Sequence, residues 1–423
     1  MASLSKDSLI LDKAREVLKQ AEDLVQYLEK RGLPEPNFTA TSPLPPAENE
    51  YDSIRIGLTE AAQDIIHLAK GPMHWFRTLL YSVSDLGAWQ TAVRFKYFTI
   101  IPLDKPMSVK DIAAAAKMDE DRLGRIMKIL ASLHCFEEVE EDVYGHTSLS
   151  AYIAKNKDIQ ADASCILDET FEAASLTATA IEKAPYTSDS AHSAFHLRFG
   201  TDSYTWYKEN QGRATNFALA MAGVSRMNRA KTELRNNFPW GSLQTKRVVD
   251  VGGGSGHVSI YLATQLPELE FIVQDVNPDM LVEGPKLPEF ESVQKRVSFM
   301  QYDFGKPQPV TDAGLFMLRQ ILHNYPDDVC VQILKSFVPA LERSSPSTSI
   351  LISEILLPEM NTEPKAQEHQ LRQFDILMLS SFAAKQRTAK QFTQLFKQAD
   401  ARFEVVKLHH KGVNGLLEVR LVQ

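Results

Sequence analysis

The chain has 423 residues, 44% of them hydrophobic and 24% charged, which is the composition of a globular protein with two or three domains. A formal net charge of −8, with lysines and arginines scattered rather than massed, argues against nucleic-acid binding. The three cysteines are far apart and indicate neither a disulfide framework nor a metal site. Because the sequence shows no signal peptide and no apolar run long enough to span a membrane, we expect a cytoplasmic protein without membrane contact.

The first predicted element is an amphipathic helix over residues 8–31, followed by a Pro-rich linker over residues 35–50. We take residues 1–50 as this N-terminal helix and linker. Such a helix cannot bury its own apolar stripe, so it needs a partner surface on this chain or on a second copy.

Residues 51–230 are predicted to form a mostly helical domain. In it, a helix capped by Ser108, a second helix over 120–133 and two short strands at 136–139 and 143–146 follow in order. Two helices and a hairpin are the pattern of a winged helix, which often binds DNA. Here the hairpin turn is acidic and would repel phosphate, which favours a structural or dimerising module.

Residues 231–423 change to short apolar strands that alternate with helical stretches. This alternation predicts an α/β domain with a largely parallel, doubly wound sheet. The predicted strands cover residues 247–251, 269–274, 297–301, 313–319 and 349–354, and a final hairpin covers 403–411 and 415–421.

A glycine-rich loop follows the first of these strands, in the run VVDVGGGSGHVSIYLATQLP. Glycines there allow a tight turn and a close approach to a ligand, and the helix after them offers free N–H groups to a negative group. A dinucleotide fingerprint would need glycine or alanine at position 257, where this chain has His257. We therefore expect a different nucleotide-type ligand on the loop residues Asp250, Gly252, Gly253, Gly254 and Gly256.

Acidic residues recur where the next two strands end. Asp275, followed by Val276, stands where such folds bind ribose hydroxyls, and Asp303, followed by Phe304, stands where an adenine amino group would lie. His323 follows the fourth strand and could remove a hydroxyl proton, and Glu354 at the end of the fifth strand could orient its imidazole.

The runs VVDVGGGSG, IVQDV, QYDF, RQILHNYPDD, ISEILLPE and FDILMLSSFAAKQRTAKQFTQLFKQA resemble the caffeate/flavonoid-type O-methyltransferases, particularly their fungal secondary-metabolism branch. The front segment from Ser108 to Ser150 is similar to that family's winged-helix dimerisation region. The resemblance implies a Rossmann-like methyltransferase domain behind a helical dimerisation domain, S-adenosylmethionine as cofactor, no metal and a homodimer.

The same resemblance implies roles for individual residues. The glycine loop would hold the methionine part of the cofactor, Asp275 the ribose and Asp303 with Phe304 the adenine, and Arg319 would lie near the cofactor. His323 matches the general base and Glu354 one of its two flanking acids. The resemblance places Asp375 and Met378 in the helix that lines the substrate pocket. Apart from the resemblance, we expect the apolar residues Phe195, Phe217, Met221 and Met378 to form a pocket for an aromatic substrate, and His134 to contact the substrate in the cyclase alternative given below.

Three positions depart from the family pattern. Gln386 stands where the family places the second acid, Ala383 and Ala384 replace paired glycines, and Asn324 replaces an aspartate. Glutamine can hydrogen-bond an imidazole but cannot stabilise its charged form by charge.

Three functions remain open at this stage. The first is O-methyl transfer to a small aromatic or polyketide-type secondary metabolite, with His323 as base. The second is a cofactor-bound cyclase that catalyses dehydration or pericyclic ring closure, in which His134, Arg198 or His323 would polarise a polyketide carbonyl. The third is a regulatory winged-helix protein with a vestigial cofactor fold, which the acidic wing disfavours.

Overall fold

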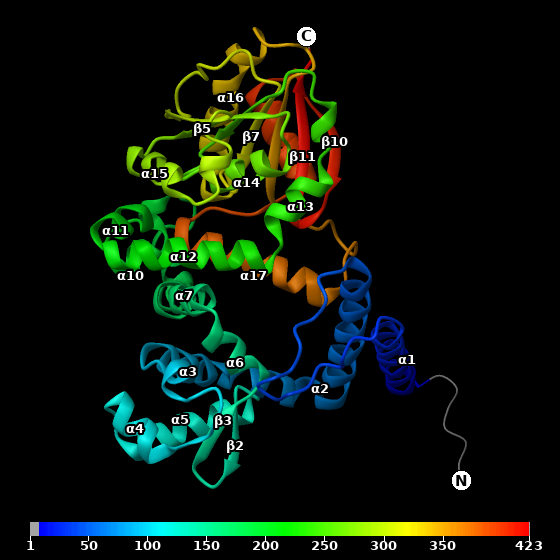
Figure 1. The fold of residues 1–423 in the computed structure, drawn as a ribbon, viewed down its shortest axis with the longest axis vertical. Coiled ribbons are helices and arrows are strands. Elements are labelled where there is room, and N and C mark those ends of the chain that lie inside the picture. Colours follow the sequence, from blue (N-terminus) through cyan, green and yellow to red (C-terminus); the bar gives the residue numbers. More distant parts are fainter. Residues whose placement is uncertain (1–7, 423) are drawn as a thin grey trace. The chain divides into compact units, whose positions relative to one another are not determined.

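Two compact units divide the chain in the computed structural model, which describes residues 8–422 (Figure 1). The first seven residues of the predicted N-terminal segment therefore lie outside the described residues. Unit 1 comprises Met1–Phe171, Gly212–Gly223 and Pro364–His369; unit 2 comprises Glu172–Gln211, Val224–Glu363 and Gln370–Gln423.

Unit 1 opens with two helices, α1 (Leu9–Lys30) and α2 (Asn49–Arg94). The apolar face of α1 finds part of its partner surface on this chain, because its Tyr27 and Leu28 are buried against Tyr51 of α2. Gly71 interrupts α2 with non-helical backbone angles (φ 62°, ψ 173°), directly before a proline that cannot continue the helical hydrogen bonding.

A small three-stranded sheet follows in unit 1, with strand order β1-β3-β2. The two helices and the hairpin predicted for this region form in the expected order. Ser108 caps the first of these helices, since its side chain accepts a hydrogen bond from the backbone N–H of Asp111. The elements are α3 (Tyr97–Ile100), β1 (Met107–Ser108), α4 (Val109–Ala116), α5 (Glu120–Ser132), β2 (Phe136–Glu140), β3 (Val143–His146), α6 (Ser148–Lys155), α7 (Lys157–Cys165) and the π-helix η1 (Ile166–Thr170).

Unit 2 contains an eight-stranded mixed sheet with the order β10-β11-β8-β7-β4-β5-β6, and β9 pairs with β8 off this path. The central strands are parallel and β11 runs antiparallel to β8. The predicted α/β architecture is confirmed. The strands are β4 (Arg247–Val251), β5 (Glu270–Asp275), β6 (Val297–Gln301), β7 (Leu315–Arg319), β8 (Ser349–Leu357), β9 (Arg387–Thr388), β10 (Phe403–His410) and β11 (Gly412–Leu421).

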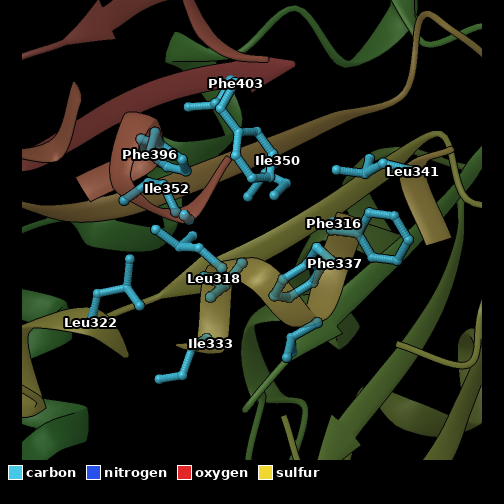
Figure 2. Close-up of a cluster of buried hydrophobic side chains, with 14 of the residues drawn as sticks. Phe316, Leu318, Leu322, Ile333, Phe337, Leu341, Ile350, Ile352, Phe396 and Phe403 are labelled. Atoms are coloured by element: carbon cyan, nitrogen blue, oxygen red, sulfur yellow. The ribbon is translucent and has the colours of Figure 1, made fainter. Parts of the chain in front are cut away.

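Helices cover the sheet on two faces, as the near-continuous apolar strands require. On one face, alternate residues of β7 and β8 such as Phe316 and Ile350 pack against α16 and α18, where Phe337 and Phe396 are fully buried (Figure 2). The helices that follow α7 along the chain are α8 (Phe171–Ala174), α9 (Thr177–Lys183), α10 (Ala194–Phe199), α11 (Ser203–Glu209), α12 (Gln211–Met227), α13 (Ala230–Asn237), α14 (His257–Gln265), α15 (Pro278–Glu283), α16 (Asp327–Leu341), α17 (Lys365–Phe382) and α18 (Ala389–Ala399).

Residues 172–211 precede the predicted domain boundary at residue 231, yet they pack within the sheet-bearing unit. The hydroxyl of Ser188 donates to the carbonyl of Ala383 (2.7 Å), and the ring of Tyr204 lies 5.6 Å from that of Phe382. These contacts attach α11 and the segment before α10 to the end of α17.

The order of connection reverses beside β4. The chain passes from β4 outward to β5 and β6, then returns to the other side of β4 with β7. Open α/β sheets bind ligands at such a switch point, outside the carboxyl ends of the strands. The loops after β4, β5, β6 and β7 all begin at this edge.

Candidate active site at the carboxyl edge of the sheet

The glycine loop after β4 has a backbone that only glycine adopts readily. Gly252, Gly254 and Gly256 have φ values of 72°, 58° and 73°. A Cβ atom on Gly252 would lie 2.5 Å from Cδ1 of Ile321, so a side chain there would collide with the loop after β7. The loop thus brings its backbone close to the loop after β7 at the switch point.

Asp250, near the end of β4 just before this loop, is buried. Its Oδ2 accepts a hydrogen bond from the hydroxyl of Ser259 on α14 (2.7 Å), and burial raises the pKa of its carboxyl to about 6. We expected Asp250 to bind the cofactor; in this structure its carboxylate contacts the protein and is 3% exposed.

Asp275 at the end of β5 connects the two loops of the predicted cofactor site. Its Oδ2 accepts the N–H of Gly254 (2.9 Å) and its Oδ1 accepts the N–H of Asn277 (2.9 Å). Each carboxylate oxygen can accept a second hydrogen bond, so the side chain remains able to bind a pair of ribose hydroxyls.

The loop after β6 carries the residues predicted to bind adenine. Asp303 is about half exposed and accepts the N–H of Gly305 (2.9 Å), while Val276 on the neighbouring loop is exposed. The ring of Phe304 meets that of Tyr325 edge to face, 5.8 Å away. The rings of Phe304 and Tyr325 therefore lie next to the acidic residues at this edge of the sheet.

Arg319 at the end of β7 is a partly buried cation beside the glycine loop. Burial lowers its pKa, against the attraction of Asp250 and Glu354. Within residues 8–422 its guanidinium forms no hydrogen bond or ion pair. The neighbouring His257 has its pKa lowered to about 4 by burial and by the charges of Lys231 and Arg319. A partly buried cation that has no ion-pair partner among the described residues, next to a glycine-rich loop, fits an anionic ligand group such as the cofactor carboxylate.

His323 lies in the turn after β7, and this turn is held on both sides. Glu354 of β8 accepts the N–H groups of Ile321 (2.9 Å) and Leu322 (2.8 Å) through Oε1. The guanidinium of Arg387 donates to the carbonyls of Leu322 and Tyr325, each at 2.9 Å. The backbone of the His323 turn is therefore fixed by one buried anion and one buried cation.

Arg387 is a site residue that the sequence did not predict. It is fully buried, and it also pairs with Asp327 at the start of α16 (2.7 Å). The Arg-Thr dipeptide was visible in the sequence, but nothing in it shows that this arginine reaches a turn more than 60 residues away.

The imidazole of His323 faces two side chains through the same nitrogen. Nδ1 lies 3.3 Å from Oε2 of Glu354 and 3.1 Å from the amide nitrogen of Gln386. Oε2 of Glu354 and Oε1 of Gln386 are both buried without a hydrogen-bond partner within residues 8–422. The oxygen and nitrogen ends of an amide have the same shape, so the Gln386 amide can be turned by 180° to place its oxygen toward Nδ1. A proton on Nδ1 then donates to this oxygen and to Oε2 of Glu354. That tautomer leaves Nε2 with a free lone pair.

The predicted substrate residues fall into two groups. In unit 2, Oδ1 of Asp375 accepts the backbone N–H of Gln386 (2.8 Å), Met378 is buried, and Phe195 is buried against Phe199 and Trp206. Contacts with protein thus account for these three, and their substrate role stays a prediction.

The other three substrate residues belong to unit 1. His134 stacks on Phe38 at 4.8 Å, Phe217 packs against a small buried cluster, and Met221 is exposed. Their substrate role is likewise still a prediction. Arg198, named for the cyclase alternative, pairs with Glu172 in unit 2 (2.5 Å).

Three further observations concern metal binding, membrane contact and other cavities. Among the described residues, no group of three or more His, Cys, Asp or Glu side chains could hold a metal ion. None of the helices in residues 8–422 combines the length and apolar character needed to cross a bilayer. A cavity of about 530 Å³ in unit 1, lined by residues including Arg94, Lys157 and Arg213, contains none of the predicted site residues.

Comparisons with known proteins show the family of the chain. Residues 183–402 match the model of the O-methyltransferase domain, and residues 80–156 match that of the O-methyltransferase dimerisation domain. The chain is 40% identical over 408 residues to O-methyltransferase sol2 of Alternaria solani, covering 96% of this chain and 94% of that protein.

Two solved structures share the fold at 20% identity. The crystal structure of OxaC in complex with SAH and oxaline covers 97% of this chain and 98% of its own, with a TM-score of 0.77. The structure of LepI in complex with SAM covers 96% and 99%, with a TM-score of 0.71.

The chain belongs to the O-methyltransferase family. It is an S-adenosylmethionine-dependent methyltransferase, and its helical dimerisation domain precedes the α/β domain along the chain.

Proposed function

We propose that the protein methylates a hydroxyl group of a small aromatic or polyketide-type secondary metabolite, and that His323 is the general base. The observation that carries this proposal is the pairing of His323 with Glu354 at the switch point that also holds the glycine loop. A base that removes a proton from a ligand of this sheet has to stand at this edge, where such sheets bind their ligands.

The residues of the carboxyl edge would divide the work of binding. The backbone of Gly252 and Gly254 would hold the methionine part of S-adenosylmethionine, and Arg319 its carboxylate. Asp275 would bind the ribose and Asp303 with Phe304 the adenine. The cofactor supplies an electrophilic methyl group on a sulfonium. Everything else in the mechanism is the placement of the acceptor hydroxyl and the removal of its proton.

Glu354 would prepare His323 for that proton. Because Glu354 accepts from Nδ1–H, the base nitrogen Nε2 points its lone pair away from the buried carboxylate. When Nε2 takes the acceptor proton, the charge of Glu354 stabilises the imidazolium that forms. A positioned base of this kind contributes about 100- to 10,000-fold to rate.

The experiment uses methyl-labelled S-adenosylmethionine, the full-length protein and a panel of phenolic and polyketide-like acceptors, followed by mass spectrometry. We expect label in the product and S-adenosylhomocysteine in equal amount. His323→Ala should lower kcat by about 100-fold or more while the Kd for S-adenosylmethionine changes little. Full activity of that variant would remove His323 from the mechanism.

A second candidate is a cofactor-bound cyclase, and Gln386 is the observation that favours it. Gln386 supplies no charge beside the imidazole, which suits a hydrogen-bond donor to a carbonyl better than a strong base. A solved structure described as "A Pericyclic Reaction enzyme" shares this chain's fold, with a TM-score of 0.71. Conversion of an acceptor without mass gain and without loss of S-adenosylmethionine would establish this alternative.

We also propose that the protein forms a homodimer through its N-terminal, mostly helical region. In this proposal the strands β1 to β3 with α4 and α5 form a winged helix that contributes to the dimer. The part of α2 after Gly71 exposes large apolar side chains, among them Met73 (73% exposed), Phe76 and Tyr81. Such a continuous exposed apolar face marks a protein interface. Light scattering should give twice the mass of one chain, and Phe76→Glu should yield a monomer; a wild-type monomer would refute the proposal.

A further inference from the structure

Within residues 8–422, the imidazole of His323 forms an ion-pair contact with a single carboxylate. From β8, Oε2 of Glu354 lies 3.3 Å from Nδ1; from the segment before β9, the neutral amide of Gln386 lies 3.1 Å from the same atom. Both side chains are almost fully buried, at 1% and 3% exposure, so water does not screen this corner of the site. The imidazole of His323 therefore interacts strongly with the charge of Glu354, and Gln386 contributes no charge.

The other charged groups around this turn are engaged elsewhere. On α17, Oδ1 of Asp375 accepts the backbone N–H of Gln386. At the start of α16, Asp327 is bound by Lys385 (2.6 Å) and by Arg387 (2.7 Å). From β7, the positive charge of Arg319 is attracted by Glu354 and Asp250.

We infer that the acceptor is a hydroxyl that is itself acidic, such as the enol of a β-dicarbonyl unit or a phenol carrying an electron-withdrawing carbonyl or nitro group, and that Gln386 is the positioning residue that sets this preference. The inference rests on the proposed function, because it concerns the proton that His323 removes.

The charge change on proton uptake explains the preference. With an acid at position 386, the His323 cluster would go from −2 to −1 when Nε2 takes the proton; with Gln386 and Glu354 it goes from −1 to 0. Two anions at hydrogen-bond distance stabilise an imidazolium more than one does, whereas an amide offers only a hydrogen bond. The single-anion site is the weaker base, so more of the driving force must come from the acceptor.

The reaction step balances without any further reagent. The acceptor O–H proton passes to Nε2 of His323, the oxygen lone pair forms the new O–C bond, and the electrons of the C–S bond stay on sulfur as the neutral thioether. The imidazolium then returns its proton to water. Gln386 affects the uptake and the return of this proton, and it takes no part in forming the O–C bond or breaking the C–S bond.

The test compares acceptors of graded acidity in two proteins. Wild type and Gln386→Glu are incubated with methyl-labelled S-adenosylmethionine and 4-nitrophenol, 4-hydroxyacetophenone, phenol, 4-methoxyphenol or acetylacetone, and kcat and KM are measured across pH. We expect Gln386→Glu to raise kcat/KM for 4-methoxyphenol at least about tenfold more than for 4-nitrophenol. The acid limb of its pH profile should also move to higher pH.

Controls separate the charge from the shape of the side chain. Gln386→Met, of similar volume and no charge, should not raise the rate on any acceptor. Gln386→Asp carries the same charge on a shorter side chain and replaces Gln386→Glu if that variant fails to fold. S-adenosylmethionine affinity is measured for each, since a change in cofactor binding alone would alter all acceptors equally.

Two results would overturn the inference. An equal effect of Gln386→Glu on all acceptors would show that position 386 does not set the acidity preference, and would leave methyl transfer by His323 intact. Failure of wild type to label even the most acidic acceptors would refute the inference together with the methyl transfer proposed above.

Discussion

The carboxylate of Glu354 contacts both the imidazole of His323 and the backbone that carries it. Oε1 accepts the N–H groups of Ile321 and Leu322, and Oε2 lies 3.3 Å from Nδ1 of the histidine. One buried side chain thus fixes the position of the turn, the rotamer of the imidazole and, through the charge, its tautomer. The two functions of this carboxylate can be separated by mutation.

Glu354→Gln should separate them, because the glutamine Oε1 still accepts the two backbone N–H groups while the charge is lost. We expect kcat to fall about 100-fold or more, with the Kd for S-adenosylmethionine and the thermal midpoint nearly unchanged. Glu418→Gln is the matched control, since Glu418 also forms a buried pair with a histidine, His409 (2.9 Å), in the C-terminal hairpin. A similar loss in both variants would show that general destabilisation, and not the charge at His323, lowers the rate.

Gly252→Ala should abolish cofactor binding. Its φ of 72° disfavours a side chain, and a Cβ there would lie 2.5 Å from Cδ1 of Ile321, so the Ile321 side chain would have to turn away from the loop. Gly200→Ala is the control, because Gly200 also has positive φ (82°) but a Cβ there would meet no other atom within 4 Å. Calorimetric titration with S-adenosylhomocysteine should detect no binding to the first variant and near wild-type binding to the second. Binding by Gly252→Ala would mean that the loop tolerates displacement.

The sequence predicted the strands of unit 2 closely because each is a short apolar run with turn residues on both sides. The strand at 247–251 agrees with β4 at both ends, and the predicted strand at 349–354 only stops early, since β8 continues through Leu357. Acids that follow such strands could be placed at the carboxyl edge without knowing any contact between them.

Contacts between residues far apart in the chain were not predictable in the same way. Arg387 lies in the two-residue strand β9, which shows no periodicity, and its partners Leu322 and Asp327 are 65 and 60 residues away. The sequence also placed Phe195 at a substrate pocket; the structure shows it buried beside Phe199 and Trp206, and its substrate role stays a prediction. A pattern shows which residues are apolar but not which of two apolar environments each one enters.

Arg387→Met should destabilise the protein and slow it. The substitution leaves the carbonyls of Leu322 and Tyr325 without their donor and Asp327 without one of its cations. We expect the free energy of unfolding to fall by about 3 kcal/mol. Arg402→Met removes a comparable but exposed pair with Glu342 and Asp400, and should cost much less, because water screens an exposed ion pair. Equal losses in urea denaturation would contradict a special role for the buried guanidinium.

Asp250 should make stability fall as pH rises, the reverse of the usual behaviour of a carboxylate. Burial raises its pKa from 3.8 to about 6, so between these values the folded protein holds a proton that the unfolded chain has released. Stability is then lost as pH increases through this window, and the loss is complete above about pH 7. The difference in pKa corresponds to about 3 kcal/mol. Asp250→Asn cannot titrate and should lack this component.

The measurement is urea denaturation of both proteins without cofactor at intervals from pH 4 to pH 7. The free energy of unfolding of Asp250→Asn relative to wild type should rise steadily across this range, because only wild type has to accept a buried negative charge beneath the glycine loop. A difference that does not change with pH would mean that Asp250 is ionised throughout in the folded protein. In that case the hydroxyl of Ser259, which donates to Oδ2, would have to stabilise the charge far more than one hydrogen bond ordinarily does.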